Sequence, residues 1–161
     1  MKEEIRSLTE ELFEHGAEDD LAVLHQILTG LNDKNKGKYS SYVGALLNMQ
    51  KECTASTCTV TVPISKTLFN SLGIVHGGMT ATVIDSAMGT LANLLAPEGF
   101  GAVTSQLNIH YIHPVNGENM TAAAQILHQG RNTMVVEGYV LNAAGKRVAH
   151  ATGSFYLIEK N

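Results

Sequence analysis

One segment limits the possible folds more than any other, because residues 70–97 contain an apolar stretch of helical length with a single charge. After Gly77 and Gly78, apolar side chains recur at intervals of three and four residues, at Met79, Val83, Ile84, Ala87, Met88, Leu91, Ala92, Leu94 and Leu95. This spacing predicts an α-helix that is apolar on nearly all of its surface. Such a helix must be enclosed by its domain, so Asp85, its single charge, is also expected to lie inside.

Both ends of this helix can be predicted. Pro97 and Gly99 follow the last apolar residue, and residues of these types end helices. At the start, Gly77 and Gly78 have no side chains, so another group can approach the unpaired backbone N–H donors of the first turn. The positive end of the helix dipole also favours negative charge there.

The segments before and after the helix have a residue pattern that is typical of β-strands. Six segments fit this pattern: Tyr42–Glu52, Thr57–Ile64, Ala102–Ile112, Thr121–His128, Thr133–Leu141 and Arg147–Ile158. The connections between most of them are short and rich in turn residues, which favours antiparallel pairing. We therefore predict an α+β fold, with an antiparallel sheet of five to six strands wrapped around one long central helix.

The first part of the chain has a different pattern. Leucine and isoleucine recur at helical spacing through residues 1–31 with a break near Gly16, and a polar run follows at 32–38. We interpret residues 1–40 as a helical N-terminal extension and linker, and residues 41–161 as a single domain. The three lysines of the polar run fit a solvated linker better than a phosphate site.

Charge and composition exclude several classes of protein. Residues 1–20 hold eight acids against Lys2 and Arg6, so this segment is −6 and the rest of the −4 chain is +2, which gives no case for nucleic-acid binding. No run resembles a signal peptide or a membrane span, so we expect a cytoplasmic protein. Cys53 and Cys58 flank a turn, where a hairpin disulfide is conceivable; we favour two thiols in a reducing compartment.

A set of residues around the helix start resembles a known signature. Asn70, the Gly-Ile-Val-His-Gly-Gly run at 73–78 and Asp85, nine residues after His76, are similar to the signature of hotdog-fold acyl-CoA thioesterases of the phenylacetate-degradation type. The stretch 103–114 also resembles that family's strand after the central helix, which commonly ends in Tyr-x-x-Pro. The match covers about residues 42–158. It implies a hotdog thioesterase domain acting on a small or aromatic acyl-CoA.

The residues suit this chemistry in their own right. Thioester hydrolysis needs a donor for the developing oxyanion and a carboxylate that attacks the carbonyl or activates water. Nine residues at about 100° each place His76 and Asp85 on opposite sides of the helix, roughly 13 Å apart along it. They cannot serve one site within one chain, whereas a two-fold dimer could join them. The resemblance likewise implies a homodimer, possibly a homotetramer, with the acid donated across the interface.

The resemblance assigns a role to each matching residue. It implies that Gly77 gives the oxyanion N–H, Asn70 orients the carbonyl or water, and Asp85 is base or nucleophile. His76 would hold the thioester end and Thr104 would position water, although a capping histidine and an ordinary strand threonine are the alternatives.

The contacts to the coenzyme are expected at two further positions. These are Gly78 and Arg131, the latter in a turn that resembles one near the coenzyme's phosphates; an exposed turn arginine is equally consistent. No cofactor is expected, because coenzyme A is part of the substrate. No metal is expected either, since His110 and His113 would lie on opposite faces of a strand. The alternative functions are a non-catalytic acyl-CoA-binding regulator and a hotdog hydratase.

Overall fold

The computed structural model describes residues 1–160, which form two compact units. One unit comprises Met1–Asn48 with Ser65–Thr67, and the other comprises Met49–Ile64 with the chain from Leu68 onward. No helix within the described residues combines the length and hydropathy that a membrane span requires.

The second unit is built on a six-stranded antiparallel sheet, as predicted. Its strands occur in the order β1-β2-β4-β5-β6-β3. Their bounds are Gln50–Cys53 for β1, Thr57–Pro63 for β2, Phe100–Tyr111 for β3, Asn119–Gln129 for β4, Thr133–Asn142 for β5 and Arg147–Glu159 for β6. β1 and β3 are therefore the two edges of the sheet.

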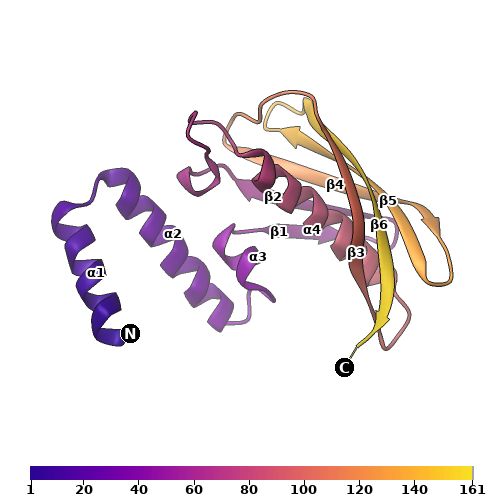
Figure 1. The fold of residues 1–161 in the computed structure, drawn as a ribbon, viewed down its shortest axis with the longest axis horizontal. Helices are drawn as coiled ribbons and strands as arrows, with labels where there is room; N and C mark the ends of the chain where they lie inside the picture. The colour runs from indigo at the N-terminus through magenta and orange to yellow at the C-terminus, as the bar shows by residue number, and fades with distance from the viewer. Residues whose placement is uncertain (161) are drawn as a thin grey trace. The chain divides into compact units, whose positions relative to one another are not determined.

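The central helix, α4 (Gly77–Leu95), lies along one face of this sheet (Figure 1). It contacts β2 through β6 and buries Thr80 and the apolar residues Val83, Ile84, Ala87, Met88, Leu91 and Ala92. The predicted central helix against the sheet is confirmed, but one chain does not enclose it completely, because Leu94 is 55% exposed and Met79 and Leu95 are only half-buried. The helix ends at Leu95, and the backbone of the following residue, Ala96, is extended because Pro97 comes next.

The predicted strand Tyr42–Glu52 is wrong in its first half. Residues Tyr42–Leu46 form a short helix, α3, and β1 begins only at Gln50. The Ser41 side chain caps α3 by accepting a hydrogen bond from the Gly44 N–H at 3.1 Å. Asn48 then has a φ of 51°, a conformation that asparagine tolerates and that interrupts an extended strand.

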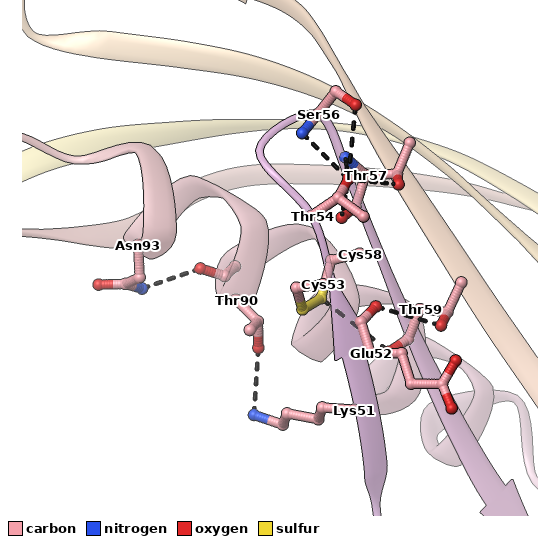
Figure 2. Close-up of a disulfide and its surroundings, with 11 residues drawn as sticks. Lys51, Glu52, Cys53, Thr54, Ser56, Thr57, Cys58, Thr59, Thr90 and Asn93 are labelled. Carbon is pink, nitrogen blue, oxygen red and sulfur yellow. Dashed lines mark hydrogen bonds between the residues drawn. A yellow bond between two sulfur atoms is a disulfide. The ribbon is translucent and has the colours of Figure 1, made fainter.

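The expectation of two free thiols is also wrong, because Cys53 and Cys58 form a disulfide (Figure 2). The two residues lie directly opposite each other in the β1–β2 ladder, with a Cα–Cα distance of 4.0 Å. Thr54 closes the turn, and its N–H donates to the Thr57 carbonyl at 2.8 Å. The inference of a reducing compartment rested on the thiols and loses that support.

The first unit is helical. It contains α1 (Lys2–His15), α2 (Glu18–Asn35) and α3, and a 3-10 turn follows at Lys66–Leu68. The break near Gly16 is where the sequence predicts it, but α2 continues to Asn35, past the predicted start of the linker. Gly30 lets α2 approach α3 closely, because a Cβ there would lie 2.3 Å from the Ala45 carbonyl oxygen.

Candidate active site

The start of α4 leaves one backbone donor free. His76 caps the helix, and its Nδ1 accepts a hydrogen bond from the Gly78 N–H at 2.8 Å. The His76 carbonyl accepts from Met79 and Thr80. Within residues 1–160 no acceptor takes the Gly77 N–H, because the first residue of a helix has no carbonyl one turn before it. This free donor lies at the positive end of the helix dipole.

Gly77 and Gly78 lack a side chain for two different structural reasons. A Cβ on Gly78 would lie 3.0 Å from the His76 Nδ1, so any larger residue at this position would press on the capping ring. A Cβ on Gly77 would meet the Tyr111 ring only at 3.5 Å, which is ordinary contact. Gly77 instead leaves the space beside its free N–H open. The Gly78 N–H donates to His76 in this structure, and the expected contact of Gly78 with the coenzyme stays a prediction.

Asn70 organises the loop before the helix. Its Oδ1 accepts from the Leu72 N–H at 2.9 Å and from the Ile74 N–H at 3.3 Å. Gly73 completes the turn with a φ of 73°, a conformation that favours glycine. With its oxygen used in this way, the Asn70 carboxamide can present only its Nδ2 donor to a ligand.

This loop and the helix start border a cavity of about 330 Å³. The polar groups on its wall are Asn70, Thr80, Tyr111 and His113, while Ile74, Val75, Val115 and Val148 supply apolar surface. Gly77 lies on the same wall. The cavity therefore combines an apolar interior with the donors of the helix start.

Asp85 lies in a separate, shallower pocket of about 230 Å³ with Ala81, Thr82, Thr104 and Leu107. The Thr104 hydroxyl donates to the Asp85 Oδ1 at 2.9 Å. β3 has an irregular register between Thr104 and Gln106, directly beside this contact. A carboxylate has about four acceptor positions, so this bond leaves Asp85 able to accept a proton or bind water.

The two pockets have no residue in common. α4 and β3 run in opposite directions, so Tyr111 contacts the helix start and Thr104 contacts Asp85 further along. Eight residues separate Gly77 from Asp85, which corresponds to about 12 Å of helix. In one chain, the structure thus keeps the Gly77 N–H and the Asp85 carboxylate apart, as the helical spacing indicates.

Arg131 lies away from the helix start. It is exposed in the β4–β5 turn, and the neighbouring Gln129 side chain donates to the Leu95 carbonyl at 3.3 Å, at the far end of α4. The structure does not bring Arg131 together with Gly78 in one chain. Within the described residues, no group of three or more histidine, cysteine, aspartate or glutamate side chains could hold a metal ion.

Sequence reasoning missed Tyr111 as a residue of the site. Its hydroxyl donates to the Gly77 carbonyl at 3.0 Å, and its ring lies over Gly77. The signal was available, since Tyr111 begins the Tyr-x-x-Pro motif after the central helix. The same motif contains His113, which lines the larger cavity.

Comparisons with known proteins identify the family. A sequence model of the thioesterase superfamily matches residues 72–149. Acyl-coenzyme A thioesterase PaaI of Escherichia coli is 31% identical over 100 residues, which cover 62% of this chain and 69% of PaaI. Human acyl-coenzyme A thioesterase 13 is 33% identical over 90 residues, 55% of this chain and 64% of the human protein.

A solved structure extends the likeness to nearly the whole chain. The BH2602 protein of Bacillus halodurans, crystallised with CoA, is 39% identical with a TM-score of 0.88, over 94% of this chain and 99% of that one. Coverage this high extends the likeness beyond the sheet and α4 into the N-terminal region. The chain belongs to the thioesterase superfamily, as a thioester hydrolase of the hotdog fold.

Proposed function

We propose that the protein hydrolyses acyl-CoA thioesters, with the Gly77 N–H as oxyanion donor and Asp85 as base or nucleophile. The observation that carries this proposal is the unpaired Gly77 N–H at the start of α4, on the wall of a cavity. The relatives named acyl-coenzyme A thioesterases and the CoA-bound neighbour support the coenzyme portion of the substrate.

The complete site requires a homodimer in this proposal, because Gly77 and Asp85 line different pockets of one chain. β3 is an edge strand, and its residues from Thr104 to Tyr111 are largely exposed, so its backbone can pair with a second copy. A two-fold axis near the middle of this stretch places the Tyr111 end of one β3 beside the Thr104 end of the other. Two equivalent sites result, and pairing of dimers into tetramers remains compatible with them.

In the reaction, Asp85 takes a proton from water, or attacks the thioester carbonyl itself. In the first route hydroxide adds to the carbonyl carbon, and the Gly77 N–H stabilises the oxyanion. The C–S bond then breaks, and the coenzyme A thiolate leaves and is protonated. In the second route an acyl-aspartate anhydride forms and water hydrolyses it. Both routes yield a carboxylic acid and free thiol, and neither needs a cofactor.

The remaining residues orient the reactants. Thr104 already bonds to Asp85 and can hold the attacking water beside it. The bonds of Asn70 Oδ1 and His76 Nδ1 leave Asn70 Nδ2 and His76 Nε2 as donors, and in this proposal these bind the acyl carbonyl or the thioester end. The cavity of about 330 Å³ is near the lower end of the usual range for ligand sites, so we propose a small or aromatic acyl group.

A panel of short, aromatic and long-chain acyl-CoA esters, assayed for release of free thiol, tests this function. We expect turnover of the short and aromatic esters and weak turnover of long chains. Saturable binding without thiol release would instead support an acyl-CoA-binding regulator, and water addition to an enoyl-CoA would support a hydratase.

A further inference from the structure

The peptide that joins Gly77 to Gly78 is hydrogen-bonded at both of its ends. Its oxygen, the Gly77 carbonyl, accepts from the Tyr111 hydroxyl at 3.0 Å. Its nitrogen, the Gly78 N–H, donates to the His76 Nδ1 at 2.8 Å. One partner comes from β3 and the other is the cap of α4. A peptide plane held at both oxygen and nitrogen cannot turn without breaking one of these bonds.

Such a restraint matters at this position because the local sequence does not supply one. Glycine has more backbone freedom than any other residue, and here two glycines are consecutive. The N–H groups of the first helical turn also have no partner within the helix. The Gly77 N–H itself lies in the preceding peptide, whose His76 carbonyl accepts from the Met79 and Thr80 N–H groups. Gly77 joins that peptide to the Gly77–Gly78 peptide, so the position of Gly77 depends on what holds both of them.

We propose that Tyr111 is a positioning residue that, together with His76, clamps the Gly77–Gly78 peptide and so holds Gly77, with its free N–H, in a fixed position beside β3. This inference rests on the proposed function, in which that N–H receives the oxyanion. Tyr111 acts through the peptide and not on the reacting atoms. The Tyr111 ring adds to the restraint because it packs beside Gly77: a Cβ added to Gly77 would lie 3.5 Å from the ring carbons, which is van der Waals contact.

The clamp also sets the tautomer of His76. Because Nδ1 accepts from Gly78, the neutral imidazole carries its proton on Nε2. The bonds run in one direction, from the Tyr111 hydroxyl through the peptide to the exposed His76 ring, and bonds in such a chain polarise one another. Tyr111 thereby supports both donors of the site, the Gly77 N–H and the His76 Nε2–H.

The test compares Tyr111→Phe with a matched control, Tyr156→Phe. Both tyrosines are on strands and similarly exposed, at 56% and 46%, but Tyr156 lies outside both pockets. Tyr111→Phe keeps the ring and removes only the hydroxyl. We expect it to lower kcat by between about threefold and tenfold, the value of one hydrogen bond, with KM unchanged. Tyr156→Phe should match the wild-type enzyme.

Nuclear magnetic resonance supplies a readout that does not depend on activity. In the wild-type protein we expect His76 as the Nε2–H tautomer, assigned against His76→Asn, and a Gly78 amide that exchanges slowly with solvent. In Tyr111→Phe the Gly77 and Gly78 amide signals should shift and the Gly78 exchange should accelerate. Gly78→Ala, which displaces the ring, should abolish the tautomer preference and also lower kcat.

Each result decides a separate question. Unchanged kcat in Tyr111→Phe, with shifted glycine amides, would overturn the role of the clamp in catalysis. A fall in kcat with unmoved glycine amides would also overturn it, because the loss would arise elsewhere. Absence of thiol release from the wild-type protein would refute the proposed function, and the spectra would still decide whether the clamp exists.

Discussion

Asp85 is the residue on which the proposed chemistry depends most. It is half-buried and is the one charged residue of α4, where a carboxylate without a hydrogen-bond partner would be costly. The Thr104 hydroxyl offsets part of this cost by donating to Oδ1, without supplying a positive charge. The other acceptor positions of the carboxylate stay open to water or substrate.

Replacing Asp85 by asparagine tests this role. The substitution preserves size and the contact with Thr104 but removes the base, so we expect kcat to fall by at least about 10²-fold while the fold is retained. Thiol release measures kcat, and circular dichroism measures whether the fold is retained. Asp19→Asn, an exposed change in the helical unit, is the control and should keep full activity. Near-normal hydrolysis by folded Asp85→Asn would remove Asp85 from the mechanism.

Glu137 offers a second test at the residue scale, away from the site. Its side chain bonds to the His150 Nε2 at 2.9 Å and to the Gln125 Nε2 at 2.7 Å, and the hydrogen bond to His150, followed by that to Gln125, lowers the pKa of Glu137 below its ordinary value of 4.5. A carboxylate with a lowered folded-state pKa stabilises the fold above its unfolded-state pKa. That contribution is lost as the pH falls through the lowered folded-state pKa.

The free energy of unfolding of wild type and Glu137→Gln should therefore differ at neutral pH, with the wild type more stable. The difference should shrink as the pH falls below 4.5. Urea unfolding at several pH values measures it. A difference that stays constant across this range would show that the charge of Glu137 contributes nothing to stability.

At the scale of elements, two glycines explain how closely α4 approaches the sheet. A Cβ on Gly138 of β5 would lie 2.9 Å from the Met88 Sδ, and one on Gly153 of β6 would lie 2.8 Å from the Met88 Cε. The sheet thus has no side chains at these two points beneath Met88, which is fully buried. This packing holds α4 in place beside β3, and hence places Gly77 at Tyr111 and Asp85 at Thr104.

The β1–β2 hairpin lies at the opposite edge from β3, and its disulfide closes a short loop. Closing a short loop lowers the entropy of the unfolded chain less than closing a long loop does. We therefore expect the disulfide to contribute about 2 kcal/mol to the free energy of unfolding. Reduction should lower the free energy of unfolding of the wild type by about this amount. The Cys53→Ala/Cys58→Ala variant should show no response to the reductant. Equal responses from the two proteins would contradict a structural disulfide.

At the scale of the whole molecule, the proposed site belongs to the dimer, and mixing inactive variants tests this. Gly77→Val crowds the oxyanion donor, and Asp85→Asn removes the acid. If each site combines Gly77 of one chain with Asp85 of the other, a mixed dimer holds one intact site. Random reassortment makes about half of the dimers mixed, so activity should recover to about one quarter of wild type. No recovery, with mixed dimers verified by mass spectrometry, would place the site within one chain.

The helical N-terminal region allows a second whole-molecule prediction. Gln26 and Gly30 of α2 contact the short helix α3 and its end, and α4 and the sheet belong to the other unit. We expect protein lacking residues 1–40 to keep its sheet and α4 and to lose only the order of α3. Circular dichroism and thermal unfolding measure this. Insoluble or non-cooperatively unfolding protein would show that these residues are part of the core.

The sequence by itself determined the central helix, its boundaries and the six-stranded antiparallel sheet. Helical periodicity, Pro97 and alternating strands are local signals, and each acts within a few residues. It also indicated that His76 and Asp85 lie on opposite sides of α4, because helical geometry is regular. Asn70, Gly77, Asp85 and Thr104 could be singled out through the resemblance of the sequence to the thioesterase signature, and their roles stay predictions.

Only the tertiary structure decided the features that depend on distant partners. The residues of α3 could form either a helix or a strand, and the cap at Ser41 favours the helix. Intrinsic helix and strand propensities do not decide between the two. The disulfide depends on ladder register, which turns set and composition does not. The clamp on the Gly77–Gly78 peptide needs a hydroxyl from β3, 34 residues further along the chain. Such contacts arise only when packing brings remote segments together, because no local pattern encodes them.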